Sequence, residues 1–153
     1  MDDLTNETVD EYFKEKERKK KYLKRYKKNR ACVSRLENKL ELIESKLNSI
    51  KSTNYSDMPK GGLPKGMDDW IAEKIDLEKR IEKLNKYGDT LKEETYDIID
   101  GIMEPKLVEI MEYLFIKCYE MEDVADMLGL SKRQVLRRYR DAIDAIKVDK
   151  EDD

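Results

Sequence analysis

The stretch that decides the fold is residues 121–147, MEDVADMLGLSKRQVLRRYRDAIDAIK. Apolar residues recur at helical spacing on both sides of Gly129, and Ser131 is a preferred residue at a helix N-terminus. Ala125 is small enough for a close helix crossing, and Gly129 can adopt the left-handed conformation that ends a helix sharply. We therefore predict two short helices joined by a tight turn at 129–131. This pattern is typical of a helix-turn-helix whose second helix enters the major groove of DNA.

The predicted second helix has one apolar face and one cationic face. The apolar face consists of Val135, Tyr139, Ala142 and Ile146. Glutamine suits adenine and arginine suits guanine in the major groove, so base contacts are predicted for Gln134, Arg137 and Arg133. Phosphate contacts are predicted for Ser131, Lys132, Arg138 and Arg140. The alternative is a helical pair that serves only for packing.

The composition favours long, solvated helices. Charged residues make up 44% of the chain and hydrophobic residues only 39%. Such a ratio is typical of coiled coils, which bury one stripe of each helix. The net charge of -3 does not suggest nucleic-acid binding, but the charge is unevenly distributed. Residues 104–130 carry two lysines and seven acids, whereas residues 131–147 carry six cations and two acids.

Two long heptad patterns precede the motif, within residues 8–102. The first seam comprises Tyr22, Tyr26, Asn29, Val33, Leu36, Leu40, Ile43, Leu47 and Ile50. The second comprises Met67, Trp70, Leu77, Ile81, Leu84, Leu91, Ile98 and Ile102, with Lys74, Gly88 and Thr95 in the remaining positions. Steps of three and four over this length predict an antiparallel helical hairpin, or coiled coil. The seams could instead pair with a second copy of the chain as a homodimer.

Prolines, glycines and possible capping residues predict where the helices of the hairpin begin and end. Residues 51–66 hold two of the three prolines and three of the six glycines, which predicts a loop. Asp68 or Asp69 is predicted to cap the second helix. Gly88 is predicted to be a weak point in an otherwise continuous helix, because glycine there costs about 1 kcal/mol relative to alanine.

A strongly basic run lies at residues 14–30. It contains eleven Lys or Arg against Glu15 and Glu17, a net charge of +9. One interpretation is a solvated helical face that pairs with acids of the second helix. The other is contact with DNA phosphates through Lys20, Lys21, Lys24, Arg25 and Lys28.

Residues 106–117 form the most apolar stretch of the chain, and they follow Glu104 and Pro105, a proline that is allowed in a first helical turn. We predict that they form the buried first helix of a three-helix domain over residues 103–148, because the two motif helices alone bury too little surface. Residues 149–153 form an acidic tail. The predicted fold class is therefore all-α, a long antiparallel helical hairpin followed by a C-terminal helix-turn-helix domain.

No catalytic, metal or cofactor site is predicted. The chain has no histidine, and Cys32 and Cys118 are isolated, which argues against a zinc site. Neither a phosphate-binding glycine loop nor a nucleophile motif is present, so we do not expect an enzyme. No apolar run reaches the length of a membrane span and the N-terminus does not resemble a signal peptide, so we expect a cytoplasmic protein.

The chain also resembles a known group of regulators. The residues concerned are YLKRYKKN from Tyr22, MPKGG from Met58, and EDVADMLGLSKRQV at 122–135 followed by Ala142. The motif resembles the bacterial sigma-factor domain that reads the promoter −35 element. Residues 22–147 resemble the sigma-region-4-like regulators encoded by phages and prophages of Gram-positive bacteria. One departure is Arg138, because that position is usually apolar in such helices, and we expect Tyr139 to take over its packing.

The expected function is therefore a sequence-specific regulator that binds double-stranded DNA. The resemblance implies control of phage gene expression, as an activator that contacts RNA polymerase. The first alternative is a phage packaging component similar to a small terminase subunit, although in such proteins the DNA-binding module usually comes first. The second alternative is a coiled-coil protein that binds and inhibits a partner protein.

Overall fold

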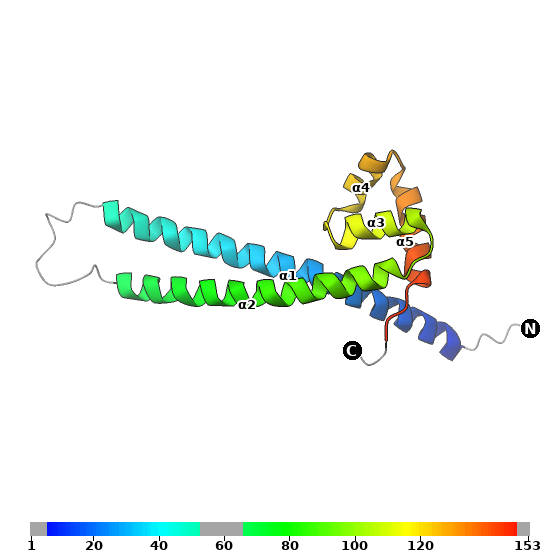
Figure 1. The fold of residues 1–153 in the computed structure, drawn as a ribbon, viewed down its shortest axis with the longest axis horizontal. Helices are drawn as coiled ribbons and strands as arrows, with labels where there is room; N and C mark the ends of the chain where they lie inside the picture. Colours follow the sequence, from blue (N-terminus) through cyan, green and yellow to red (C-terminus); the bar gives the residue numbers. More distant parts are fainter. Residues whose placement is uncertain (1–5, 53–65, 150–153) are drawn as a thin grey trace, which may run out of the picture. The chain divides into compact units, whose positions relative to one another are not determined.

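The computed structural model describes residues 6–52 and 66–149, and throughout these ranges the regular structure is helical. The helices are α1 (Asn6–Ser52), α2 (Met67–Asp100), α3 (Pro105–Phe115), α4 (Met121–Leu128) and α5 (Lys132–Ala145) (Figure 1). The all-α prediction is confirmed. Of the predicted loop, residues 53–65 lie outside the described residues, as do residues 150–153 of the predicted acidic tail.

The two long helices differ slightly from their predicted bounds. Helix α1 continues to Ser52, so the first two residues of the predicted loop are helical. Helix α2 begins at Met67, and the backbone N–H of Trp70 donates to the carbonyl of Gly66 at 3.0 Å. The prediction that Asp68 or Asp69 caps α2 is therefore wrong. Both lie in the first turn, where a carboxylate interacts favourably with the positive end of the helix dipole.

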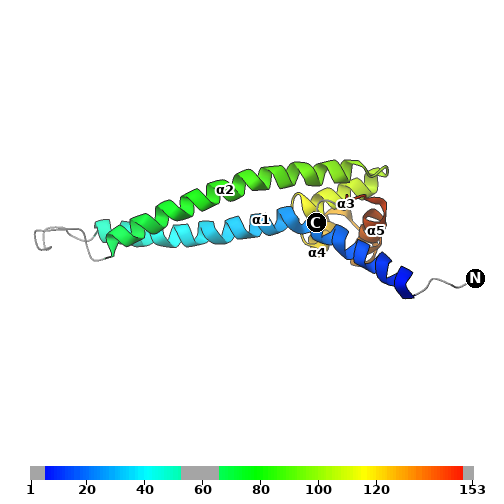
Figure 2. The same cartoon turned by 90° about the horizontal axis from the view of Figure 1, so that it is seen from below.

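Contacts divide the chain into two compact units, and one of them comprises residues 29–88. Its apolar core consists of Leu36, Ile43 and Leu47 from α1 with Met67 and Leu77 from α2. Ion pairs join Lys39 to Glu73 at 3.5 Å and Lys74 to Glu44 at 3.9 Å. Arg30 donates to the side chain of Asn85 at 2.9 Å. Residue numbers rise along α1 as they fall along α2, so the two segments run in opposite directions side by side (Figures 1 and 2).

Gly88 does not break α2, because it accommodates a side chain of α1. Asn29 is only 6% exposed, and its amide nitrogen donates to the carbonyl of Leu84 at 2.8 Å. A Cβ atom at position 88 would lie 2.4 Å from Oδ1 of Asn29. The helix is therefore continuous, as predicted, and the glycine is explained by a close approach to Asn29.

The second unit contains the described residues of 1–28 and 89–153. Its core includes Leu107, Ile110, Met111, Leu114 and Phe115 of α3, which confirms that residues 104–117 contribute a buried helix. The same core includes Val124 and Ala125 of α4, Val135, Tyr139, Ala142 and Ile143 of α5, and Ile99 and Ile102. Leu23 of α1, which is fully buried, completes it. The first part of α1 is thus an integral part of the packing around α3–α5.

Candidate nucleic-acid interface

A short turn at residues 129–131 joins α4 to α5. Gly129 has φ 66° and ψ 31°, the left-handed conformation that glycine adopts without strain. The N–H of Leu130 donates to the carbonyl of Ala125 at 2.9 Å. The N–H of Gly129 donates to the carbonyl of Asp126 at 3.4 Å. These bonds satisfy carbonyls at the end of α4 that would otherwise lack a partner. The chain therefore leaves α4 abruptly and enters α5 after only three residues.

Helix α5 begins with a capping box. The Ser131 hydroxyl accepts a hydrogen bond from the Gln134 N–H at 3.1 Å, and Oε1 of Gln134 accepts one from the Ser131 N–H at 2.8 Å. The predicted base contact of Gln134 and phosphate contact of Ser131 thus fall on side chains that already cap the helix. The S-x-x-Q spacing is visible in the sequence and was the pattern from which this pairing could have been predicted.

The exposed face of α5 is cationic at its start. Val135, Tyr139, Ala142, Ile143 and Ile146 are buried. Arg133, Arg137 and Arg140 are exposed. At 3.6 residues per turn these three arginines lie on the side opposite the buried residues. The structure therefore presents three of the predicted DNA-contacting residues together on one solvent-facing surface, the arginine face.

Two other predicted residues are placed differently. Arg138 is half-buried, at the border between the buried side and the arginine face. Tyr139 is 7% exposed and stacks on Phe115 with ring centroids 6.1 Å apart, as expected from the departure at position 138. Burial, and secondarily the charge of Glu17, raises the pKa of Tyr139. Lys132 pairs with Glu122 of α4 at 2.7 Å, which raises the pKa of Lys132 and lowers that of Glu122.

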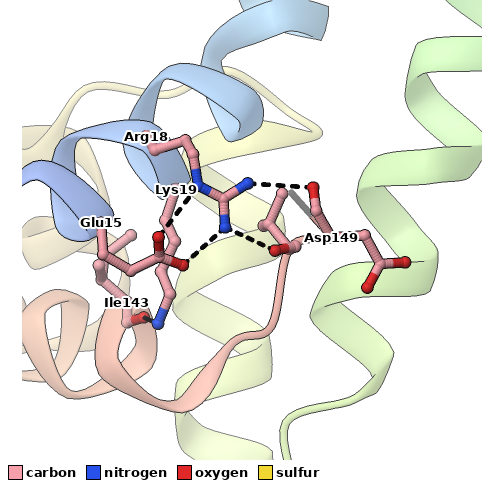
Figure 3. A network of polar contacts seen from close by, with 6 residues as sticks. Glu15, Arg18, Lys19, Ile143 and Asp149 are labelled. Atoms are coloured by element: carbon pink, nitrogen blue, oxygen red, sulfur yellow. Dashed lines mark hydrogen bonds and ion pairs between the residues drawn. The ribbon is translucent and has the colours of Figure 1, made fainter. Parts of the chain in front are cut away.

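Part of the basic run of α1 is used within the same unit. The Arg18 guanidinium binds Glu15 at 2.6 Å and donates to the carbonyls of Val148 at 2.6 Å and Asp149 at 3.0 Å (Figure 3). Lys19 donates to the carbonyl of Ile143 at 3.2 Å, near the C-terminal end of α5 (Figure 3). Cations at that position complement the negative end of the helix dipole. These contacts span more than one hundred residues, and no sequence pattern predicted them.

Further cations of the run also have partners. Arg25 forms an ion pair with Glu94 at 2.6 Å and stacks over the Tyr22 ring, 3.7 Å from its centroid. Lys27 pairs with Glu120 at 3.5 Å, and Lys20 with Glu17 at 3.4 Å. Of the five residues of α1 predicted to contact phosphates, Arg25 and Lys20 therefore have acidic partners. The other three, Lys21, Lys24 and Lys28, are exposed.

The C-terminal end of α5 contacts α1 through Asp144 and Ile143. The Tyr12 hydroxyl donates to Asp144 at 3.0 Å, and this hydrogen bond is the main cause of the raised pKa of Tyr12. Asp144 is near the C-terminal end of α5. Arg133 and Arg137 of the arginine face lie in the first half of α5, and Arg140 lies in the turn that follows.

The described part of the chain contains no cluster of His, Cys, Asp or Glu suited to a metal ion. Within the same residues, no helix is both long enough and apolar enough to span a membrane.

No curated protein and no solved structure matches the chain. The family model described as "Protein of unknown function (DUF1492)" matches residues 46–147, more than half of the chain. The chain therefore belongs to the DUF1492 family.

Proposed function

We propose that this protein is a sequence-specific DNA-binding transcription regulator. In this proposal α3, α4 and α5 form a helix-turn-helix domain whose recognition helix is α5, and α1 and α2 form an antiparallel helical hairpin. The observation that carries it is the arginine face of α5, which stays exposed and consists of Arg133, Arg137 and Arg140. Recognition helices contact base edges mainly through their N-terminal residues, and Arg133 and Arg137 lie in the first half of α5.

The details of the turn support the same proposal. The left-handed Gly129 and the capping box of Ser131 and Gln134 define the ends of α4 and α5 through local hydrogen bonds. Val135, which is fully buried, anchors the first turn of α5 in the core. A recognition helix needs such fixed positioning, because base contacts depend on the orientation of its side chains.

The resemblance to sigma-region-4-like regulators extends the proposal to a phage activator that contacts RNA polymerase. A single three-helix module reads only a few base pairs, so a second contact is needed for tight specific binding. Polymerase, or a second copy of the chain bound through the long helices, would supply it. Measuring the mass of the protein alone and with polymerase would distinguish these sources.

Arg137→Ala tests the recognition helix. Binding sites are first selected from a library of random double-stranded DNA, and affinity for the selected site is compared with affinity for a scrambled duplex. We expect Arg137→Ala to lower this specificity ratio about tenfold or more, since a bidentate arginine–guanine contact gives about 1–3 kcal/mol of discrimination. Lys106→Ala, which removes an exposed cation of α3, is the matched control and should leave the ratio unchanged. An unchanged ratio for Arg137→Ala would refute its role in base recognition.

Gln134→Glu separates folding from DNA binding. Glutamate can accept the N–H of Ser131 as glutamine does, and a carboxylate at a helix N-terminus is favourable, so the free energy of unfolding should not decrease. The new negative charge at the start of α5 should lower DNA affinity about tenfold or more by repelling phosphates. Gln134→Ala is a poorer test, because it also removes the capping contact. Undiminished DNA binding by Gln134→Glu would place the DNA elsewhere.

A further inference from the structure

Residues 12–28 of α1 include two groups of residues on different sides of the helix, which the sequence alone does not separate. Tyr12, Lys19, Leu23 and Lys27 face α3–α5 or the residues that adjoin these helices, through the contacts with Asp144, Ile143, the core and Glu120. At 3.6 residues per turn, positions 14, 21 and 28 come about half a turn away from these four. The second group consists of Lys14, Lys21, Lys24 and Lys28, here called the lysine stripe.

The lysine stripe is exposed at all four positions. No described residue forms a hydrogen bond or an ion pair with any of these four lysines, although six other cations of the same run have such partners. Lys24 and Lys28 are separated by one helical turn, and like charges at this spacing destabilise a helix. Folding of the described chain therefore does not explain why this side of α1 is basic.

An open cleft follows the lysine stripe along α1. Its volume is about 680 Å³, and the nine described residues that line it all belong to α1. Seven of the nine are Lys or Arg, including all four lysines of the stripe, and Glu17 is the only acid among them. The cleft therefore offers several cations at close spacing to one extended anion.

We propose that the lysine stripe binds the phosphate backbone of double-stranded DNA as a second surface, independent of base sequence. This inference rests on the proposed function in one respect, the choice of double-stranded DNA as the polyanion that binds. The stripe has no apolar side chain, whereas protein interfaces are enriched in aromatic residues and depleted in lysine. A membrane-surface helix would need exposed apolar residues interleaved with its cations, whereas the large exposed apolar residues of α1, Val9, Tyr12, Phe13 and Leu42, lie outside residues 14–28. Repeated phosphates are the partner that this chemistry fits best.

Three lysines are replaced together to test the stripe, in the full-length protein. The variant is Lys21→Ala/Lys24→Ala/Lys28→Ala, and alanine at exposed helical positions preserves the helix. Binding to a random-sequence DNA duplex is measured over a range of salt concentrations. We expect affinity to fall roughly tenfold or more and the slope of log K against log salt to become shallower by about 2 to 3, since each lost phosphate contact contributes about 0.9.

Two controls match this variant. Lys79→Ala/Arg80→Ala/Lys83→Ala removes the same charge from exposed positions of α2 and should change neither affinity nor slope. Arginine at positions 21, 24 and 28 keeps the charge and should retain binding. If the stripe variant binds the duplex with unchanged affinity and slope, the proposal is overturned. Loss of binding equal to that of the α2 control would overturn it too, because the effect would then be one of net charge.

The roles of the lysine stripe and of α5 are distinguishable in the same assays. If the stripe variant loses duplex binding while Arg137→Ala keeps its sequence preference unchanged, the stripe proposal stands and the role of α5 fails. If only Arg137→Ala has an effect, the opposite holds. Loss of binding to polyglutamate or to anionic lipid vesicles, with duplex binding intact, would assign the stripe to an acidic protein or a membrane and overturn the proposal.

Discussion

Gly129 is the residue that sets the geometry between α4 and α5. Its φ of 66° lies in the left-handed region, and a Cβ atom there would meet no heavy atom within 4 Å. A substitution at this position thus changes backbone strain without a steric clash. This makes it a clean probe of whether the abrupt turn stabilises the domain.

Gly129→Ala should lower the free energy of unfolding by about 1–2 kcal/mol, the cost of a left-handed conformation for an L-residue with a Cβ atom. Gly129→Asn should lose less, because asparagine adopts this conformation more readily. Urea denaturation with an unchanged m-value measures both. Equal stability of the alanine variant and the natural protein would show that the turn can relax to another conformation.

The pairing of α1 with α2 in residues 29–88 contains one polar residue, Asn29, among the buried side chains of this range. Asn29 donates to the carbonyl of Leu84, whereas its Oδ1 is buried and lacks a hydrogen-bond partner among the described residues. The adjacent Gly88 leaves space for this amide. A polar residue at one seam position can fix the register of paired helices at some cost in stability.

Gly88→Ala should therefore destabilise the protein, although alanine normally stabilises a helix interior by about 1 kcal/mol relative to glycine. The Cβ atom would lie 2.4 Å from Oδ1 of Asn29, so the amide must move and weaken its bond to Leu84. In an Asn29→Ala background the same change should be stabilising. A double-mutant cycle by urea denaturation checks this, and additive effects of the two substitutions would rule out the contact.

The molecule as a whole builds one unit from both halves of the sequence. Residues 6–28 pack in the same unit as the described residues that follow position 88. Leu23 is fully buried in the core that α3, α4 and α5 share. The proposed DNA-binding domain is thus stabilised by residues about one hundred positions earlier in the chain.

Leu23→Ala should lower the free energy of unfolding by about 2–5 kcal/mol, the range for removing a buried leucine side chain. Leu42→Ala in the same helix is the control, because Leu42 is 64% exposed and its loss should cost less than about 0.5 kcal/mol. Hydrogen exchange of the α5 amides should accelerate only in the Leu23 variant. Similar behaviour of the two variants would mean that α1 does not support α5.

Local sequence patterns were enough to predict the helical fold and where α4 ends and α5 begins. The three-and-four spacing located buried positions such as Leu36, Leu77 and Val135, because helical periodicity is a local property of the chain. Ser131 and Gly129 likewise indicated where α5 begins and α4 ends, since capping involves residues only a few positions apart. The capping role of Gln134 could have been read from the same stretch.

Long-range contacts determine which cations of residues 14–30 are bound within the protein and which remain exposed. Arg18 and Lys19 bind carbonyls at the end of the chain's last helix and beyond it, whereas Lys21 and Lys28 of the same run stay exposed. All four have nearly identical sequence surroundings. Lys19 lies on the side of α1 that faces α5, whereas Arg18 binds the carbonyls of Val148 and Asp149 beyond α5, and both contacts join residues more than one hundred positions apart. Local sequence patterns contain no information on such contacts, so the division of the basic run into packed and exposed lysines emerges only in three dimensions.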